Sequence, residues 1–246
     1  MNQIKTTLKT FKLSGIYQNF ETRLAYAEKE QLSYVQWLEL LLEDEVSNRQ
    51  SNRYQKNLLK AKMPAYKKIE DFDFSYQPTL DRKKINDLTT GDYIQAHENI
   101  VFTGNPGTGK THLALALGMI ALNKNKRVLF SAVSEMLYHL HASKADNSYY
   151  KKMQQYLEPD LLILDELGFK KIPSHSADDF FEIISRRYEK GSLIITTNKL
   201  FDQWEDIFAD RILSQAILDR VVHHAHLFHL SGPSYRSKGV LAEAKK

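Results

Sequence analysis

The sequence has no cysteine among its 246 residues, which excludes disulfide bonds and thiolate metal sites. A chain of this kind suits a reducing compartment, and we expect the protein in the cytoplasm. Long apolar runs are also missing, because the longest, Leu113 to Leu122, falls far short of the ~20 residues that span a bilayer. The first residues lack the apolar core and the cleavage site of a signal peptide. We therefore expect a soluble protein with no membrane partner.

Excess charge is small as well. A formal net charge of +4 does not by itself indicate a nucleic-acid partner. The distribution of charge says more, because residues 1–68 contain nine lysines and three arginines against seven acidic residues. The remainder of the chain is close to neutral. This asymmetry indicates a basic appendage on a balanced core.

Helical spacing dominates the first part of the chain. Apolar residues recur at this spacing from Ile4 to Ala27, with a break at residues 13–15, which predicts two short helices. Ser33 and Gln36 have the spacing of a capping box, and they predict a third helix that ends before Pro64. The predicted apolar face of the third helix consists of Val35, Leu38, Leu41, Leu42 and Val46.

Short β-rich runs alternate with helical patterns from Asn99 onward. This alternation is typical of βαβ units and predicts an α/β domain, with a mostly parallel sheet flanked by helices. The predicted strands are residues 99–103, 127–132, 161–165, 193–197 and 227–230.

The stretch "GNPGTGKTH" follows the first predicted strand and opens a helix, which is the context that a P-loop requires. Its glycines allow turns in which backbone N–H groups point at phosphate, and the helix N-terminus favours the same anion. We expect Lys110 to reach the β- and γ-phosphates and the Thr111 hydroxyl to ligate Mg²⁺. The predicted cofactors are ATP and Mg²⁺, and the predicted cofactor-binding residues are Gly104, Asn105, Pro106, Gly107, Thr108, Gly109, Lys110, Thr111 and His112.

Two acids follow four apolar residues in "LLILDEL", residues 161–167, so a buried strand is predicted to end in carboxylates where ligands bind. We expect Asp165 to hold Mg²⁺ through water and Glu166 to act as general base toward the water that attacks the γ-phosphate. Asn198 follows a neighbouring strand, and its amide is a candidate to bind both the γ-phosphate and this water. Read alone, Asn198 is explained equally well as a turn-forming residue.

Two arginines near the end of the chain are candidates for neutralising charge on a transferring phosphoryl group. Arg220 follows a helical pattern at which a side chain can project toward a neighbouring subunit, and Arg236 lies beyond the last predicted strand. Arg211 is a weaker competitor. Taken alone, each arginine is also explained by a surface salt bridge.

A histidine cluster near Arg220 resembles a metal site at first sight. No cysteine and no suitably spaced carboxylate accompany the cluster, so helix-end and strand-surface positions explain it better. Its members are His223, His224, His226 and His229.

Taken together, these motifs resemble those of the IstB-type ATPases, the transposition helpers of insertion sequences, in the DnaC/DnaA branch of AAA+ proteins. The resemblance runs from about residue 1 to residue 236. It is carried by "LLLEDEVSNRQ", "FDF", "GNPGTGKTHLALALG", "PDLLILDELGF", "RRYEKGSLIITTN", Trp204 with Phe208, "AILDRVVHHA" and "GPSYR".

The resemblance implies a P-loop AAA+ core that binds ATP, oligomerises on duplex DNA, and recruits and stimulates the transposase of the same element. It implies that residues 104–111 are Walker A, Asp165 and Glu166 are Walker B, and Asn198 is sensor I. Arg220 would be an arginine finger that acts in trans within a homo-oligomer. Arg236 would be a sensor-II-like contact to the nucleotide of its own subunit.

On this basis the chain divides into four parts. Residues 1–65 form a small N-terminal helical domain that binds DNA or a partner, and residues 66–98 form a linker and adenine-side segment. Residues 99–236 form the ATPase domain, and residues 237–246 form a C-terminal tail.

A stripe of basic residues on the long third helix is a candidate DNA contact. The stripe steps by four, three and four residues, which places its members on one helical face that can track phosphates. Read alone, the spacing is better explained by a solvated helix face, and the family resemblance makes the two interpretations even. The members are Arg49, Arg53, Lys56 and Lys60.

Other functions share part of this pattern. A DnaC-type helicase loader would have the same ATP site and arginines, and would differ in its N-terminal appendage and partner. A monomeric P-loop kinase would need a substrate lid and no arginine in trans, and a switch that does not hydrolyse ATP would be expected to lack Glu166.

Overall fold

The computed structural model describes residues 2–208 and 210–237, so most of the predicted tail, residues 237–246, lies outside the described residues. Contacts divide the chain into two compact units, Met1–Lys56 and Asn57–Lys246. This division falls before the predicted domain boundary at residue 65. Residues just after position 56 already contact the larger unit: Asn57 Nδ2 donates to the carbonyl oxygens of Asn125 and Lys126, at 3.5 and 3.4 Å.

The smaller unit consists of helices α1 (Asn2–Thr10), α2 (Ser14–Lys29) and the first part of α3 (Tyr34–Ala61). The predicted capping box is present at the start of α3. Ser33 Oγ accepts from the Gln36 amide at 3.3 Å, and Gln36 Oε1 accepts from the Ser33 amide at 2.9 Å. Two of the amides that helix geometry leaves unpaired are thereby satisfied, which is why the helix begins there.

The predicted apolar face of α3 is wrong for four of its five residues. Only Leu41 is buried, whereas Val35, Leu38, Leu42 and Val46 are between 50% and 66% exposed. The buried face lies one residue earlier in the sequence than the predicted face. On it, Leu41 packs with Ile16 and Phe20. The backbone of Gly15 approaches Asp44 and Glu45 so closely that a Cβ at Gly15 would clash with them, and this close approach selects the face that α3 turns toward α2.

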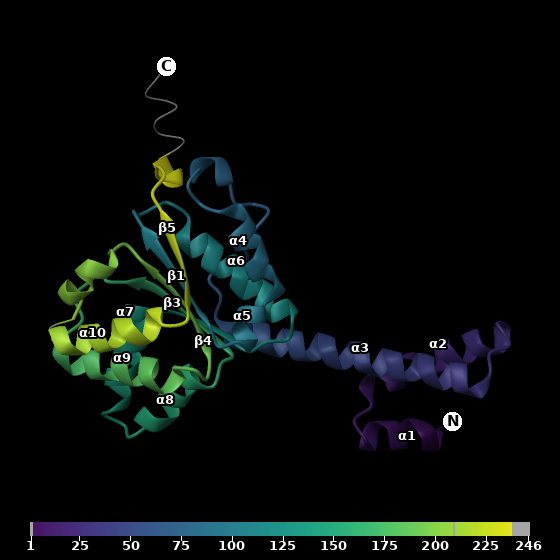
Figure 1. The fold of residues 1–246 in the computed structure, drawn as a ribbon. Helices are drawn as coiled ribbons and strands as arrows, with labels where there is room; N and C mark the ends of the chain where they lie inside the picture. Colours follow the sequence, from purple (N-terminus) through teal and green to yellow (C-terminus); the bar gives the residue numbers. More distant parts are fainter. Residues whose placement is uncertain (1, 209, 238–246) are drawn as a thin grey trace. The chain divides into compact units, whose positions relative to one another are not determined.

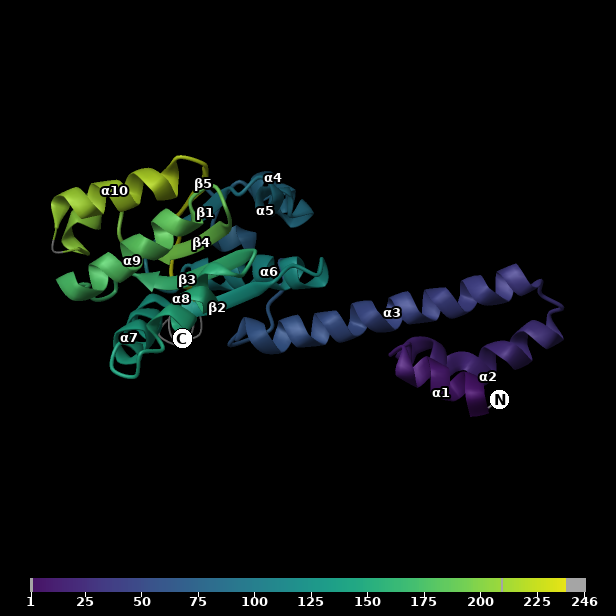
Figure 2. The ribbon, with the colours of Figure 1, turned by 90° about the horizontal axis from the view of Figure 1, so that it is seen from below.

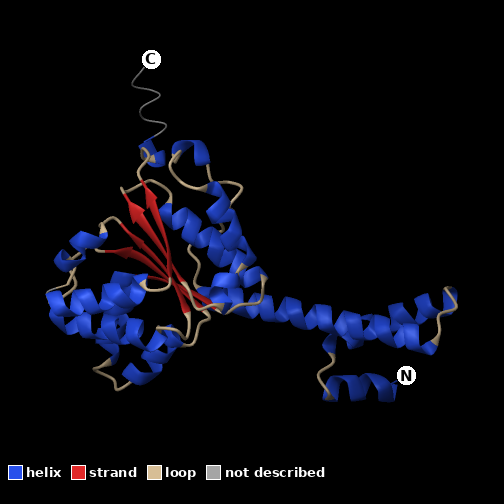
Figure 3. Cartoon of the chain, in the orientation of Figure 1, coloured by secondary structure: helices blue, strands red, loops and turns tan. Residues whose placement is uncertain are grey.

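The larger unit is built on a five-stranded parallel sheet with strand order β2-β3-β4-β1-β5 (Figure 3). All five strands coincide with the predicted β-rich runs to within two residues at each end. The interiors of β1, β3 and β4 are buried and mainly apolar because helices cover both faces of the sheet, whereas the edge strand β5 alternates between buried and exposed residues. The strands are β1 (Asn99–Gly104), β2 (Val128–Ala132), β3 (Leu161–Leu167), β4 (Ser192–Thr197) and β5 (Ala225–Leu230).

Helices form a layer on each side of this sheet (Figures 1 and 2). One layer holds α4 (Arg82–Asp87), α5 (Asp92–Gln95) and α6 (Lys110–Asn123). The other layer holds α7 (Val133–Ser143), α8 (Tyr149–Leu157), α9 (Ser174–Arg187) and α10 (Arg211–Val222). Short 3₁₀ turns lie at Phe74–Tyr76, Leu88–Thr90, Phe201–Asp206 and Tyr235–Ser237. The predicted α/β fold, a parallel sheet flanked by helices with a small helical unit before it, is confirmed.

Helix α6 is apolar nearly all round because it lies between the sheet and the segment that precedes β1. None of the helices within residues 2–208 and 210–237 combines the length and the apolar character that crossing a bilayer demands.

Candidate nucleotide-binding site

The turn between β1 and α6 has a backbone that only glycine adopts without strain. Gly107 and Gly109 have φ angles of +80° and +98°, in the left-handed region. A Cβ at Gly107 would also meet the Ser234 side chain, and a Cβ at Gly109 would meet the ring of Phe72. Glycine is therefore required at both positions by conformation and by space.

Lys110, the first residue of α6, turns its amine back onto this loop. Nζ donates to the carbonyl oxygens of Gly104 and Asn105, each at 2.7 Å, and the residue is only 9% exposed. Burial lowers the pKa of the amine, Asp165 raises it in partial compensation, and the nearby charge of Arg236 lowers it further. The site therefore holds a desolvated cation whose charged form an anionic ligand would stabilise.

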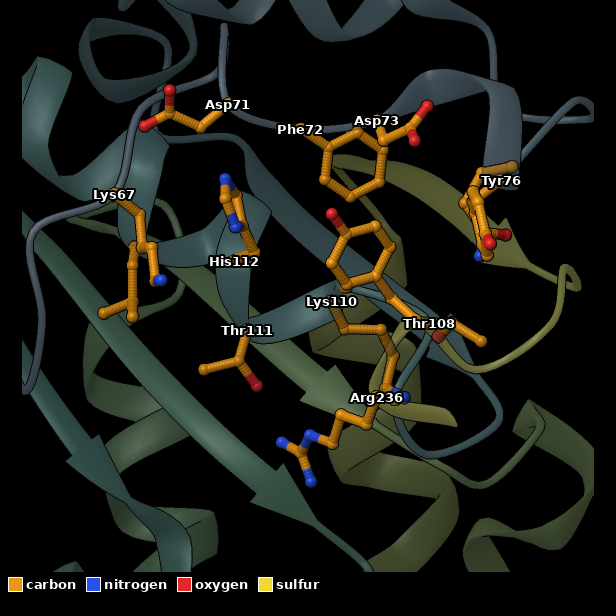
Figure 4. A pocket seen from close by; sticks show the side chains of 15 residues that line it. Lys67, Asp71, Phe72, Asp73, Tyr76, Thr108, Lys110, Thr111, His112 and Arg236 are labelled. Atoms are coloured by element: carbon orange, nitrogen blue, oxygen red, sulfur yellow. The ribbon is translucent and has the colours of Figure 1, made fainter. Parts of the chain in front are cut away.

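A cavity of about 300 Å³ opens beside this lysine (Figure 4). Its walls come from three stretches that are distant in sequence: the P-loop with the start of α6, the segment before β1, and the turn after β5. Figure 4 shows Lys110, Thr111 and Arg236 below the side chains of the segment before β1. The lining residues are Lys67, Asp71, Phe72, Asp73, Tyr76, Gln77, Gly107, Thr108, Gly109, Lys110, Thr111, His112, Leu115, Tyr235 and Arg236.

Two hydrogen bonds hold the flanking stretches against the P-loop. The ring Nε2 of His112 lies 2.8 Å from the carbonyl oxygen of Lys68, and the Tyr235 amide donates to the Gly107 carbonyl oxygen at 2.9 Å. The second bond holds the residue next to Arg236, which lines the cavity. The sequence marked "FDF" and "GPSYR" only through the family resemblance, and no local chemical signal reveals that Phe72 and Tyr235 line the site.

At the carboxyl end of β3, an aspartate meets the P-loop. Thr111 Oγ1 donates to Asp165 Oδ1 at 2.9 Å, and Asp165 is 7% exposed. A hydroxyl and a carboxylate form the kind of hard oxygen donor set that suits Mg²⁺ rather than a softer metal. The two predicted metal ligands are thus side by side, and their chemistry fits the ion.

Of the remaining Walker A positions, Asn105 and Pro106 are exposed at the tip of the turn, and Thr108 is buried with its hydroxyl donating to the Asn105 carbonyl oxygen at 2.8 Å. Asn198 is exposed and directly follows β4, the neighbour of β1 in the sheet. Neither Glu166 nor Asn198 lines the cavity beside Lys110.

The chain also matches a known protein family. Residues 6–242 match the family model described as IstB-like ATP binding protein. The chain belongs to this family. Two curated relatives agree. The insertion sequence IS21 protein of Pseudomonas aeruginosa, which its description calls ATP-binding, is 37% identical over 97% of this chain and 90% of its own length. The corresponding IS5376 protein of Geobacillus stearothermophilus is 38% identical over 86% of this chain and 84% of its own.

Solved structures similar to this IstB-like chain share its fold. The DnaC helicase loader aligns with a TM-score of 0.53 and 24% identity, over 60% of this chain and 86% of the other. DnaI aligns with a TM-score of 0.57 and 20% identity, over 67% and 90%. AMPPCP-bound DnaA from Aquifex aeolicus aligns with a TM-score of 0.57 and 23% identity, over 74% and 55%. The larger unit therefore shares the fold of these three proteins.

Glu166 of the IstB-like chain adopts a φ of +63°, which is unusual for a residue with a Cβ. Its side chain is exposed and lines a second cavity of about 480 Å³, together with His141, Lys171 and His175. The base role predicted for Glu166 thus concerns a carboxylate that lines this second cavity and not the cavity beside Lys110.

Arg220 lies near the end of α10, outside the linings of the two cavities described above. Its Nη1 donates to the Ala216 carbonyl oxygen at 2.8 Å, and its guanidinium lies over the Phe181 ring at 5.1 Å. Arg211, the weaker candidate, pairs with Glu205 at 3.0 Å. The structure thus keeps Arg220 out of the nucleotide cavity of its own chain.

The histidines of this region have ordinary partners. His223 Nδ1 lies 2.7 Å from the Tyr188 hydroxyl, His226 Nε2 lies 2.8 Å from Glu98, and His229 Nδ1 lies 2.9 Å from the Thr103 hydroxyl. One exposed group, Glu189 with His223 and His224, has its ligand atoms within 4.8 Å of one another.

The four basic residues proposed for DNA have different surroundings. Arg49 Nε pairs with the buried Glu45 at 2.7 Å, so this arginine already has a structural partner. Arg53 and Lys56 are exposed on the smaller unit, and Lys60 is exposed on the larger unit.

Proposed function

We propose that this IstB-like chain hydrolyses ATP and uses the cycle to act on duplex DNA in transposition. The observation that carries the proposal is the pairing of Thr111 with Asp165 at 2.9 Å, beside a buried lysine and a cavity. A hydroxyl, a carboxylate and an ammonium in this arrangement are the groups that Mg²⁺-dependent phosphoryl transfer requires.

In this proposal the triphosphate lies along the P-loop, and Lys110 exchanges its bonds to the Gly104 and Asn105 carbonyl oxygens for bonds to phosphate oxygens. Mg²⁺, when bound next to Thr111 and Asp165, supplies positive charge to the phosphate oxygens. A water oxygen forms a bond to the γ-phosphorus as the bond to the β-bridging oxygen breaks. Glu166 takes the proton of the water, ADP and phosphate leave, and the proton passes to solvent.

Arg220 belongs, in this proposal, to the active site of a neighbouring copy. Its position at the end of α10, outside its own nucleotide cavity, is what a guanidinium acting in trans requires. Asn198, exposed at the tip of β4, would hold the attacking water, and Arg236 would bind the nucleotide of its own chain. The chain therefore works as a homo-oligomer.

Duplex DNA and a transposase are the partners we infer. Two considerations favour them over the helicase loader: the curated relatives are proteins of insertion sequences, and the basic excess lies within residues 1–68. The likeness to the DnaC loader supports the fold but not its partner. Addition of the transposase encoded beside this chain should change the DNA-stimulated ATPase rate, whereas a replicative helicase should not.

The first test replaces the proposed base. Glu166→Gln should keep ATP binding, measured with a fluorescent nucleotide, and should lower turnover on duplex DNA by about 10²–10³-fold, because general-base catalysis contributes on this scale. The exposed Glu158→Gln is the matched control and should turn over like the original protein. Turnover of Glu166→Gln within threefold of the original would remove Glu166 from the base role.

The second test asks whether Arg220 acts in trans. Arg220→Ala and Lys110→Ala should each be inactive alone, but a mixture should recover part of the activity at interfaces that combine an intact Lys110 with an intact Arg220. Light scattering on the same mixture, with ATP and duplex DNA, measures the oligomer. A mixture that forms oligomers yet shows no activity at any ratio would contradict the trans assignment.

A further inference from the structure

The two Walker B acids stand opposite a single residue of the next strand. The ladder between β3 and β4 pairs Leu164 with Ile195 and then Leu167 with Thr197. Asp165 and Glu166 therefore share one partner position, Thr196, which is the geometry of a β-bulge. Bulges at active sites redirect side chains, and here the bulge separates a buried aspartate from an exposed glutamate.

The bulge interrupts the regular pairing of β3 with β4 at Glu166, and the positive φ of this residue is unfavourable for a residue with a Cβ. The Thr196 side chain stabilises the backbone of Glu166 at this irregular position. The Glu166 amide donates to Thr196 Oγ1 at 3.0 Å, so the hydroxyl satisfies the amide that the irregular ladder frees.

The same hydroxyl also holds the aspartate. Thr196 Oγ1 donates to Asp165 Oδ1 at 2.5 Å, and Thr196 is 1% exposed. The direction of both bonds is fixed, because an amide can only donate and an ionised carboxylate can only accept. Thr196 therefore uses its single proton on Asp165 and a lone pair on the Glu166 amide, and no other side chain among the described residues bonds both acids.

We propose that Thr196 is a positioning residue for ATP hydrolysis. It completes a chain of hydrogen bonds that runs from Thr111 to Asp165, to Thr196 and to the backbone of Glu166. These hydrogen bonds fix the position of Asp165, the proposed Mg²⁺ ligand, relative to Glu166, the proposed base. The proposal rests on the proposed ATPase function and assigns a role to a residue that does not touch nucleotide.

Two substitutions separate the hydroxyl from the packing of the side chain. Thr196→Val keeps the shape and removes the hydroxyl, and Thr196→Ser keeps the hydroxyl and removes the methyl group. Thr196→Ala takes the place of the valine variant if that variant does not fold. Ser192→Ala is the matched control, because Ser192 is a fully buried residue at the opposite end of the same strand, whose hydroxyl donates to the Tyr93 carbonyl oxygen at 3.1 Å.

The valine variant should lower kcat by about 10–100-fold, the range that loss of an orienting hydrogen bond typically costs. The Kd for ATP, titrated with a fluorescent analogue, should change by less than about threefold, because Thr196 does not line the nucleotide cavity. Thr196→Ser and Ser192→Ala should both stay within about threefold of the original kcat. A slow serine variant, or a control as slow as the valine variant, would assign the effect to packing and overturn the proposal.

Hydrogen exchange supplies a readout that does not depend on turnover. The Glu166 amide should exchange at least tenfold faster in Thr196→Val than in the original protein or in Thr196→Ser, since only the valine variant lacks the acceptor. Equal exchange in all three would overturn the proposal even if kcat fell. If the original protein bound ATP but never hydrolysed it, the proposed function would fail, and the exchange data would still decide whether Thr196 holds Glu166.

Discussion

Different interactions stabilise the interior of each of the two units. The larger unit has an extensive apolar core between the sheet and helices α7 to α10, with Trp204 and Phe180 fully buried, and α6 is itself almost entirely buried. Among the described residues, the smaller unit has a small apolar cluster of Ile16, Phe20 and Leu41, with partly buried neighbours around it. A core this small leaves little margin of stability.

Hydrogen bonds and ion pairs of charged side chains also stabilise the smaller unit. Glu45 is 5% exposed, and its Oε2 accepts from the amides of Gly15 and Ile16, at 2.7 and 3.2 Å, at the start of α2. Arg23 holds Asp44 with two hydrogen bonds of 2.8 and 2.7 Å. Buried carboxylates with hydrogen-bond partners thus supplement the small apolar cluster of this unit.

The largest effect should come from the small apolar cluster. Leu41→Ala should cost about 3 kcal/mol in the free energy of unfolding of the smaller unit, within the usual range for a buried leucine. The chain has two tryptophans, Trp37 in the smaller unit and Trp204 in the larger, so each unit carries its own fluorescence signal. Single-tryptophan variants, with Trp37→Phe or Trp204→Phe, would follow the two transitions separately in urea.

Leu162→Ala, in the core of the larger unit, is the matched variant and should move the Trp204 transition while leaving that of Trp37 in place. Leu41→Ala should do the reverse. If either substitution moved both transitions equally, the two units would unfold as one. Their cores would then differ in packing without giving the units separate stabilities.

The next effect concerns pH. The hydrogen bonds from Arg23 hold the pKa of Asp44 below its usual range. Burial raises the pKa of Glu45, but the pair with Arg49 and the amides of α2 outweigh burial, so this pKa is also lowered. Carboxyl groups titrate near pH 4 in an unfolded chain, so these two stabilise the fold above about pH 4, and this stabilisation is lost as pH falls through their lower folded values. The Trp37 transition should therefore weaken below about pH 4.

The larger unit has a carboxyl of lowered pKa as well, Asp160 beside Arg127, but its extensive core should keep the Trp204 transition in place to lower pH. Arg23→Ala should cost the smaller unit roughly 1 kcal/mol at neutral pH and flatten its acid dependence, because the largest interaction that lowers the pKa of Asp44 is then lost. Arg186→Ala, which removes an exposed pair with Glu182, is the control. A Trp37 transition that is equally stable at pH 3 and pH 7 would contradict this account.

Sequence patterns predicted the larger unit better than the smaller one. All five strands and the P-loop were predictable, because a buried parallel sheet needs unbroken apolar runs and the loop needs glycine where φ is positive. The buried face of α3 was not predictable from periodicity. Gly15 and Glu45 fix that face through a backbone approach and a capping carboxylate, and neither leaves an apolar signal.

The candidate site was predictable in its residue types and only partly in its geometry. Thr111 and Asp165 lie together because parallel strands end at one edge of the sheet. Thr196 was missed, since a threonine inside a strand is an ordinary β residue and the bulge that makes it shared by Asp165 and Glu166 has no sequence signature. Arg49 was a candidate DNA contact through its helical spacing and the family resemblance, and neither carries information about its pair with Glu45.

The smallest effect should distinguish the basic residues of the smaller unit. If Arg53 and Lys56 contact phosphates, replacing both with alanine should reduce the slope of log K against log salt for duplex DNA by roughly two. Arg49→Ala is the internal control, because its guanidinium pairs with Glu45, and its slope should match that of the original protein. Unaltered slopes for the double variant would return the stripe to a solvated helix face. A reduced slope for Arg49→Ala alone would mean that DNA competes with Glu45 for this arginine, so that DNA binding would weaken one of the contacts that hold the smaller unit together.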